Sequence, residues 1–316
     1  MAITAAQVKE LREMTGAGMM ECKKALTETG ADMEAAVEWL RKNGIMKAAK
    51  KASRIAAEGL CMIASDSDQE AAVVEVNSET DFVAQNETFR TYVAKVANQA
   101  LHTSAADIDA FLAEPWEEDN SKTVNDVLVE MTAVISEKLS IRRFEKVKAE
   151  AGCVVSYVHG GGRIGVIVEG VCPAVNDSVK EALYNVAMQV AAMSPKYIAE
   201  TDIPEDYREH EKEILLAQAI KENDELPEDR RKPQQIIEKM LAGRLVKQFK
   251  EICLNDQVYV KAEDGKQSVA QYLAQVGKAN GTEVTVKRFV RFEVGEGMEK
   301  KADNFAEEVM AQVGKG

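Results

Sequence analysis

An internal repeat constrains the fold of this 316-residue chain more than any other feature. The segment EGLCMIASDSDQEAAVVEV (58–76) aligns with AGCVVSYVHGGGRIGVIVE (151–169) at an offset of 93 residues, which places Gly59 opposite Gly152. Each copy has two apolar strands around a polar turn, followed after a loop by a helix rich in alanine and valine. Such a unit buries its apolar surface by layering the helix on an antiparallel sheet. The repeat therefore predicts an α+β fold with two related subdomains.

A small module of three helices is predicted before the repeat, over residues 1–55. The first helix is expected at about 4–14, and it ends at TGAG (15–18) because two glycines within four residues disfavour helix continuation. The second helix begins near Met19, and Asp32 is a good N-cap for the third. A unit this short has a small core, so we expect Trp39 to fill part of it.

Residues 205–252 depart from the repeat and predict an inserted arm of two helices. Pro204 and Pro233 stand where helices commonly begin, and the charged segment DELPEDRRK joins the two patterns. The apolar residues expected to pair across an antiparallel hairpin are Ile214, Leu215 and Ile220 with Ile236, Ile237, Met240 and Leu245. The pattern leaves open whether the arm docks on a partner or pairs with a second copy to form a homodimer.

These patterns predict an order of four units along the chain. The expected boundaries are 1–55 for the helical module, 56–149 and 150–293 for the two core subdomains, and 294–316 for a C-terminal helical module. The alternating segment TEVTVKRFVRFEVGEG is expected to add a strand to the second sheet. The amphipathic segment KADNFAEEVMAQV is expected to form the closing helix.

Charge is unevenly distributed and argues against a nucleic-acid-binding protein. The net charge is −13, although residues 1–55 hold ten Lys/Arg against seven Asp/Glu. An acidic body disfavours phosphate-backbone binding, which depends on lysine and arginine. The single basic run, KAAKKASR (47–54), is interpreted as a solvated helix end and linker, with an RNA-binding arm as the alternative. We therefore expect no direct nucleic-acid partner.

The sequence predicts a cytoplasmic protein with no membrane partner. No run approaches 18 consecutive apolar residues, and the charged, amphipathic N-terminus lacks the apolar core of a secretory signal. The five cysteines are odd in number and widely spaced, so buried thiols are expected rather than zinc ligands or a disulfide.

Candidate motifs for enzymatic chemistry fail on context. GGGRIG (160–165) fits a dinucleotide fingerprint, but a second strand follows it where a helix is required, so we interpret it as a hairpin turn. DSDQEA (66–71) lacks the glycine of a calcium loop at its sixth position. The three histidines are far apart and have no partner at a recognisable spacing. We therefore expect no enzyme, no catalytic residue, no bound metal and no cofactor.

The segment NSETDFVAQN (77–86) is the most unusual part of the first copy. It places Asp81 and Phe82 side by side in a polar turn after a continuous apolar strand. The second copy has Ala174 and Val175 at the equivalent place, so the subdomain fold does not require the Asp-Phe pair. Phe82 is either a core residue folded back under the hairpin or an exposed contact.

Five segments together resemble the bacterial elongation factor Ts family: VKELREMTGAGMMECKKAL (8–26), NSETDFVAQN, SIRRFE, HGGGRIGV and RFEVGEG. The resemblance covers nearly the whole chain, with the segments in the family's order. It implies a nucleotide-exchange factor for elongation factor Tu, a translational GTPase. It also implies an N-terminal module similar to ubiquitin-associated domains, two core subdomains, a helical hairpin and a C-terminal helix.

The resemblance implies three groups of functional residues. The loop that displaces Mg²⁺ from the GTPase, so that GDP leaves and GTP can rebind, corresponds to Thr80, Asp81, Phe82 and Val83. The contact with the nucleotide-binding domain of elongation factor Tu corresponds to Arg12, Met19 and Met20. The contact with a second domain of that partner corresponds to Ile135, His159, Leu241 and Gly243. Because the two methionines are adjacent, we expect one of them to be exposed.

A second interpretation remains open for the same architecture. A head similar to ubiquitin-associated domains on an acidic α+β body is also compatible with a peptide- or protein-binding adaptor or scaffold. Such an adaptor would bind many partners and would leave GDP release from a GTPase unchanged. A GDP-release assay therefore separates the two interpretations.

Overall fold

The computed structural model describes residues 3–299.

Local hydrogen bonds at the helix ends fix where the three N-terminal helices begin and end. The module consists of α1 (Ala5–Thr15), α2 (Met19–Glu28) and α3 (Met33–Lys51). Thr4 caps α1, and Gly16 ends it in the left-handed conformation at φ 66°. The Asp32 carboxylate accepts from the Ala35 N–H at 2.9 Å and starts α3, as predicted.

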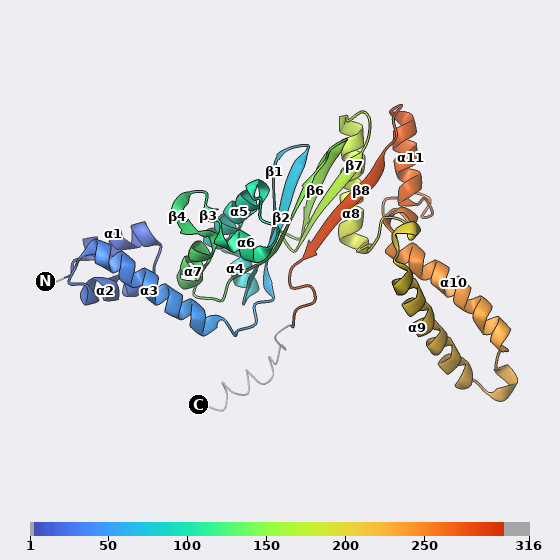
Figure 1. The fold of residues 1–316 in the computed structure, drawn as a ribbon, viewed down its shortest axis with the longest axis horizontal. Helices are drawn as coiled ribbons and strands as arrows, with labels where there is room; N and C mark the ends of the chain where they lie inside the picture. Colours follow the sequence, from blue (N-terminus) through green and yellow to red (C-terminus); the bar gives the residue numbers. More distant parts are fainter. Residues whose placement is uncertain (1–2, 300–316) are drawn as a thin grey trace.

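A small apolar core holds the module together, and α3 extends beyond it. Leu11, Cys22 and Leu26 are buried in this core, while Trp39 is half-buried at its edge. The far half of α3 packs along α7 (Val124–Ile135) of the next unit, where a Cβ placed on Gly44 would lie 3.4 Å from the Ala133 Cβ. The module is therefore attached to the body through a helix–helix contact (Figure 1).

The first core subdomain is an antiparallel sheet covered by helices. Its strands are β1 (Glu58–Ser67), β2 (Glu70–Ser78) and β5 (Ser140–Lys148), in the order β1-β2-β5. Its helices are α4 (Asp81–Gln85), α5 (Glu87–His102), α6 (Ile108–Ala113) and α7, and a two-stranded ribbon is formed by β3 (Pro115–Trp116) and β4 (Asp119–Thr123). The helix α5 packs on β1 and β2 and buries Phe89, Val93 and Val96 against the sheet.

The second core subdomain repeats this arrangement. Its strands are β6 (Cys153–His159), β7 (Ile164–Val171) and β8 (Thr285–Glu293), in the order β6-β7-β8. Its main helices are α8 (Asp177–Met193), which covers the sheet, and α11 (Val269–Ala279), which packs beside α8. The predicted α+β class, the two hairpin–helix copies and the late strand that completes the second sheet are all confirmed.

Two details show how closely the copies correspond. Gly59 and Gly152 have positive φ values of 134° and 91°, and an added Cβ at either would lie 2.1 Å from a backbone carbonyl oxygen. Only glycine, which has no Cβ, allows two backbone segments to approach so closely. Asn86 and Asn176 cap α5 and α8, accepting from backbone N–H groups at 3.1 and 2.9 Å. The same local devices therefore begin both hairpins and both helices.

The two sheets pack against each other through the faces that their helices leave uncovered. The shared layer contains Cys61 and Val73 from the first sheet with Ile167 and Val290 from the second. Because β2 is covered by α5 on one side and by the second sheet on the other, every residue from Ala71 to Ser78 is buried. This double burial explains the continuous apolar strand in the sequence.

The inserted arm is the predicted antiparallel hairpin, but its apolar seam differs from the prediction. It consists of α9 (Glu205–Asp224), the short 3₁₀ helix η2 (Glu228–Arg230) and α10 (Gln234–Ile252), and Figure 1 shows it projecting from the second subdomain. Ile214, Ile220 and Ile236 are exposed, whereas Ala219, Ile237 and Leu241 are buried. Two helices share only one narrow contact stripe, so apolar residues outside that stripe remain in solvent.

The C-terminal prediction falls mostly outside the described residues. The proposed module 294–316 is described only as far as residue 299, and the predicted closing helix lies entirely beyond that point. Among the helices that the structure describes, none combines the length and the apolar character that crossing a membrane would require.

Candidate functional site

The Asp-Phe pair lies at an exposed tip where β2 leaves the sheet. Asp81 and Phe82 form the first turn of α4, a helix of only five residues at the place where the sequence predicts a polar turn. The Phe82 side chain is 82% exposed, which rules out the core interpretation. Burying this ring elsewhere would release about 1.5–3 kcal/mol, so its exposure leaves apolar surface available to a partner. We call residues 80–83 the tip.

Two anchors hold the tip from its C-terminal side. Val83 is buried in the first core with Phe89, so one residue of α4 is fixed against the sheet layer. The Arg90 guanidinium donates to the Ala84 carbonyl at 3.3 Å and to the Gly161 carbonyl at 3.2 Å. Gly161 belongs to the turn between β6 and β7, so Arg90 ties the end of α4 to the second subdomain.

His159 lies at the start of that same turn, at the exposed end of β6. Its Nδ1 is 2.8 Å from the Tyr157 hydroxyl oxygen. Ile135 is the last residue of α7 and is half-buried against the first core. The Arg90–Gly161 hydrogen bond links the turn that begins at His159 to the end of α4. Glu137, two residues after Ile135, accepts a hydrogen bond from the Thr80 N–H. Both predicted contact residues, His159 and Ile135, therefore lie in segments that contact the tip or the helix that carries it.

Leu241 and Gly243 lie on α10, in the arm, which Figure 1 shows at the end of the molecule opposite the N-terminal helices. Leu241 is 4% exposed because it fills the seam between α9 and α10, so its side chain is not on the surface where a partner contact was predicted. Gly243 is exposed, and a Cβ placed on it would meet no heavy atom within 4 Å. The four residues predicted to touch a second partner domain are therefore split between two regions.

The N-terminal module carries an exposed methionine surface. Arg12 is exposed on α1, and Met19 and Met20 are 57% and 75% exposed at the start of α2. The expectation that at least one of the adjacent methionines is exposed is confirmed. Both are exposed, because they occupy the first turn of α2, whereas the core-facing residues of this helix are Cys22, Ala25 and Leu26.

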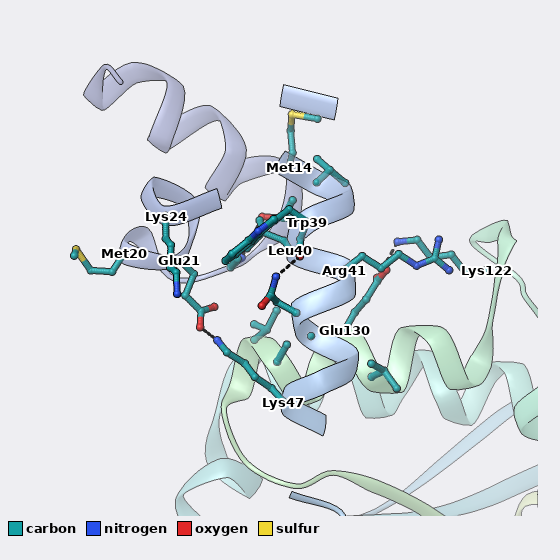
Figure 2. A pocket seen from close by; sticks show the side chains of 18 residues that line it. Met14, Met20, Glu21, Lys24, Trp39, Leu40, Arg41, Lys47, Lys122 and Glu130 are labelled. Atoms are coloured by element: carbon teal, nitrogen blue, oxygen red, sulfur yellow. Dashed lines mark hydrogen bonds and ion pairs between the residues drawn. The ribbon is translucent and has the colours of Figure 1, made fainter. Parts of the chain in front are cut away.

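A groove of about 600 Å³ adjoins this surface, between the module and α7 (Figure 2). Its apolar lining includes Met14, Val37, Trp39, Leu40 and Val134. Ion pairs between Lys47 and Glu21 and between Lys122 and Glu130 lie on its margins, and Met20 points outward from α2 at one end. Flexible methionine side chains beside an apolar groove are typical of surfaces that adapt to another molecule.

The five cysteines are the candidates for a metal ligand or a reactive thiol. All five cysteines are free and buried, as predicted. Burial raises the pKa of the Cys61 thiol to about 12 and that of Cys153 to about 11, which keeps both thiols protonated and unreactive. Within residues 3–299, no three histidine, cysteine, aspartate or glutamate side chains are grouped so as to hold a metal ion.

Comparison of the sequence with known proteins shows which family it belongs to. The family model described as "Elongation factor TS" matches residues 79–296. The Elongation factor Ts of Clostridium perfringens is 48% identical over 314 residues, covering 99% of this chain and all of the relative. The chain belongs to the elongation factor Ts family. Elongation factor Ts of Clostridioides difficile is 50% identical over 312 residues, covering 98% of this chain and 99% of the relative.

The likeness is not confined to one bacterial group. Elongation factor Ts of Trichlorobacter lovleyi is 46% identical over 319 residues, covering 99% of each chain. A likeness along the full length places this chain among the translation elongation factors and fits the α+β architecture described above. The N-terminal helices lie outside the matched residues 79–296, although the full-length relatives include them.

Proposed function

We propose that this member of the elongation factor Ts family is a guanine-nucleotide exchange factor for elongation factor Tu. It binds the GDP form of that GTPase, displaces Mg²⁺ and promotes GDP release, so that GTP can rebind during translation elongation. The observation that carries the proposal is the 82% exposure of Phe82 on a tip that the second copy of the fold lacks. The chain itself supplies no catalytic residue, metal or cofactor, and it acts in the cytoplasm without contacting nucleic acid.

The tip acts as a wedge in this mechanism. Mg²⁺ requires near-ideal octahedral geometry, so a small displacement of its surroundings weakens its binding strongly. Phe82 enters an apolar pocket of the partner, Asp81 lies beside it, and Thr80 and Val83 fix the two ends of the tip. Nucleotide affinity falls once the metal is lost, because the phosphates are no longer neutralised.

Phe82 cannot supply the whole effect. Burying the ring releases about 1.5–3 kcal/mol, whereas accelerating release ten-thousand-fold requires about 5.5 kcal/mol. The remainder comes from docking surfaces that contact the partner elsewhere. The exposed Arg12, Met19 and Met20 dock on the nucleotide-binding domain, and Ile135 and His159 contact a second domain beside the tip. Linkage requires that nucleotide weakens factor binding by the same ratio.

GDP release tests the proposal directly. Elongation factor Tu loaded with a fluorescent GDP is mixed in a stopped-flow instrument with the full chain, its Phe82→Ala variant or its Val175→Ala variant. Phe82→Ala should slow stimulated release more than tenfold, a loss of at least about 1.4 kcal/mol in transition-state stabilisation. Val175 is exposed at the equivalent place in the second copy, so Val175→Ala should match the unchanged chain. Equal rates for all three proteins would rule out the wedge.

A further inference from the structure

The backbone just before the tip is held by a residue far away in the sequence. Glu137 Oε2 accepts hydrogen bonds from the Glu79 N–H at 3.1 Å and from the Thr80 N–H at 3.0 Å, and Glu137 Oε1 accepts from the Thr80 hydroxyl at 2.7 Å. Thr80 is the N-cap of α4, yet its hydroxyl makes no capping bond to its own helix. The helix that carries Phe82 is therefore oriented from outside.

The bonding is reciprocal. The Glu79 carboxylate accepts from the Lys138 N–H at 2.6 Å and from the Arg54 guanidinium at 3.2 and 3.3 Å. The Lys138 ammonium donates to the Arg54 carbonyl at 2.8 Å. Hydrogen bonds to a carboxylate are stronger than neutral ones, and most of these are partly buried. We call the set of Arg54, Glu79, Thr80, Glu137 and Lys138 the clamp.

The clamp connects the tip to the N-terminal module. Glu137 lies two residues beyond the end of α7, and α7 packs along α3, where Arg41 pairs with Asp126 at 3.4 Å. Arg54 lies between α3 and β1, so it approaches the clamp by a second route from the same module. Both routes join the module's methionine surface to the tip through ordered contacts.

We propose that Glu137 is a positioning residue that aims Phe82 at the partner's nucleotide site once the N-terminal module has docked. The inference rests on the proposed exchange function. A helix of five residues has no stability of its own, so α4 keeps its direction only while its ends are held. The free energy of docking can distort the nucleotide site only if Phe82 already points toward it. If the tip were mobile, part of that free energy would be lost in ordering the tip on binding.

The test compares Glu137→Ala with Glu118→Ala, a matched loss of a paired glutamate whose partner is the exposed Lys95. Amide hydrogen exchange of the free full-length chain is measured first. In Glu137→Ala, the Glu79 and Thr80 amides should exchange at least about tenfold faster, because their acceptor is gone, and Glu118→Ala should leave them unchanged. Persistent protection of both amides in Glu137→Ala would overturn the clamp.

Stimulated GDP release is then titrated with each variant. Glu137→Ala should lower the maximal release rate about tenfold and leave the half-saturating factor concentration within about twofold, because the docking surfaces remain intact. A merely structural role would lower the thermal midpoint without this split. If protection is lost and the maximal rate is unchanged, Glu137 does not position the tip.

Thr80→Val is a smaller change that keeps the test valid if Glu137→Ala fails to fold. Thr80→Val removes only the hydroxyl bond at 2.7 Å and keeps both backbone bonds, so it should lower the maximal rate in the same direction by a smaller factor. A Thr80→Val rate equal to that of the unchanged chain would count against the clamp. The exchange proposal fails separately: it falls if Phe82→Ala releases GDP normally, and the amide measurement still reports whether the clamp exists.

Discussion

The two copies of the hairpin–helix unit share their scaffold and differ in the loop between hairpin and helix. In the first copy that loop contains α4, with Phe82 projecting into solvent and the clamp behind it. In the second, the segment from Cys172 to Asn176 forms no helix, and Ala174 and Val175 stand where the first copy has Asp81 and Phe82. The fold requires a strand end and a helix cap, and it leaves the residues between them free to carry function.

The copies also differ in how they bury a carboxylate on their central strand. Glu75 on β2 accepts hydrogen bonds from Asn77, Arg142, Arg143 and the Gly295 N–H, at distances of 2.6–3.1 Å. Burial alone would raise the pKa of Glu75, but these hydrogen bonds outweigh burial and hold it below the ordinary 4.5. Because Gly295 follows β8, this carboxylate also joins the two subdomains.

Replacing that carboxylate should have the largest effect on stability. Glu75→Gln should lower the free energy of unfolding by about 3 kcal/mol, because it leaves two arginines without their buried partner. Glu169→Gln in the second copy should cost less, since the only described side chain that donates to Glu169 is the exposed Lys287, at 2.9 Å. Urea unfolding of both variants measures the difference, and equal losses would contradict the proposed asymmetry.

The lowered pKa of Glu75 predicts a pH dependence of stability. A carboxylate whose pKa is lowered on folding stabilises the protein above its unfolded pKa, and it loses that contribution as pH falls through the folded value. The Glu75 contribution should therefore be complete above 4.5 and decline below it. Glu75→Gln should flatten this part of the acid unfolding profile. A profile identical to that of the unchanged chain would show that Glu75 does not titrate in this range.

Replacing Gly59 or Gly152 should lower the free energy of unfolding by similar amounts in the two copies, in contrast to replacing Glu75 or Glu169. Gly59→Ala and Gly152→Ala each place a Cβ 2.1 Å from a backbone oxygen, so each should cost about 2–3 kcal/mol in unfolding free energy. Gly281→Ala is the control: its φ of 63° is also positive, but the space around it is open, and the change should cost about 1 kcal/mol. Thermal or urea unfolding measures all three. A cost in only one copy would show that the two hairpins are not equivalent.

Transplanting the tip should have the smallest effect. In the Phe82→Ala background, Ala174→Asp with Val175→Phe restores the Asp-Phe pair in the second copy. GDP release should stay within about twofold of the Phe82→Ala rate, because the second loop has neither a helix nor a clamp to direct the ring. Recovery of the full rate would show that the aromatic side chain matters and its placement does not.

Several features were predictable because they depend on neighbouring residues. Asp32 caps α3, and Pro204 and Pro233 precede α9 and α10, since capping and proline geometry act over one helical turn. The turn at 160–165 was recognisable because a strand pattern follows it. Predicting the apolar seam of the arm failed for the opposite reason, because the stripe that two helices share depends on how they cross.

By itself, the sequence determined the repeated hairpin–helix unit, the class of the fold, the arm and the family resemblance, since periodicity, caps and motifs are written in short segments. Only the tertiary structure decided that Phe82 is exposed, that both methionines face solvent and that Leu241 is buried. It alone brought Glu137 to Thr80 across 57 residues. No pattern of spacing encodes such a contact, because it arises from how whole layers pack and not from the residues beside it in the chain.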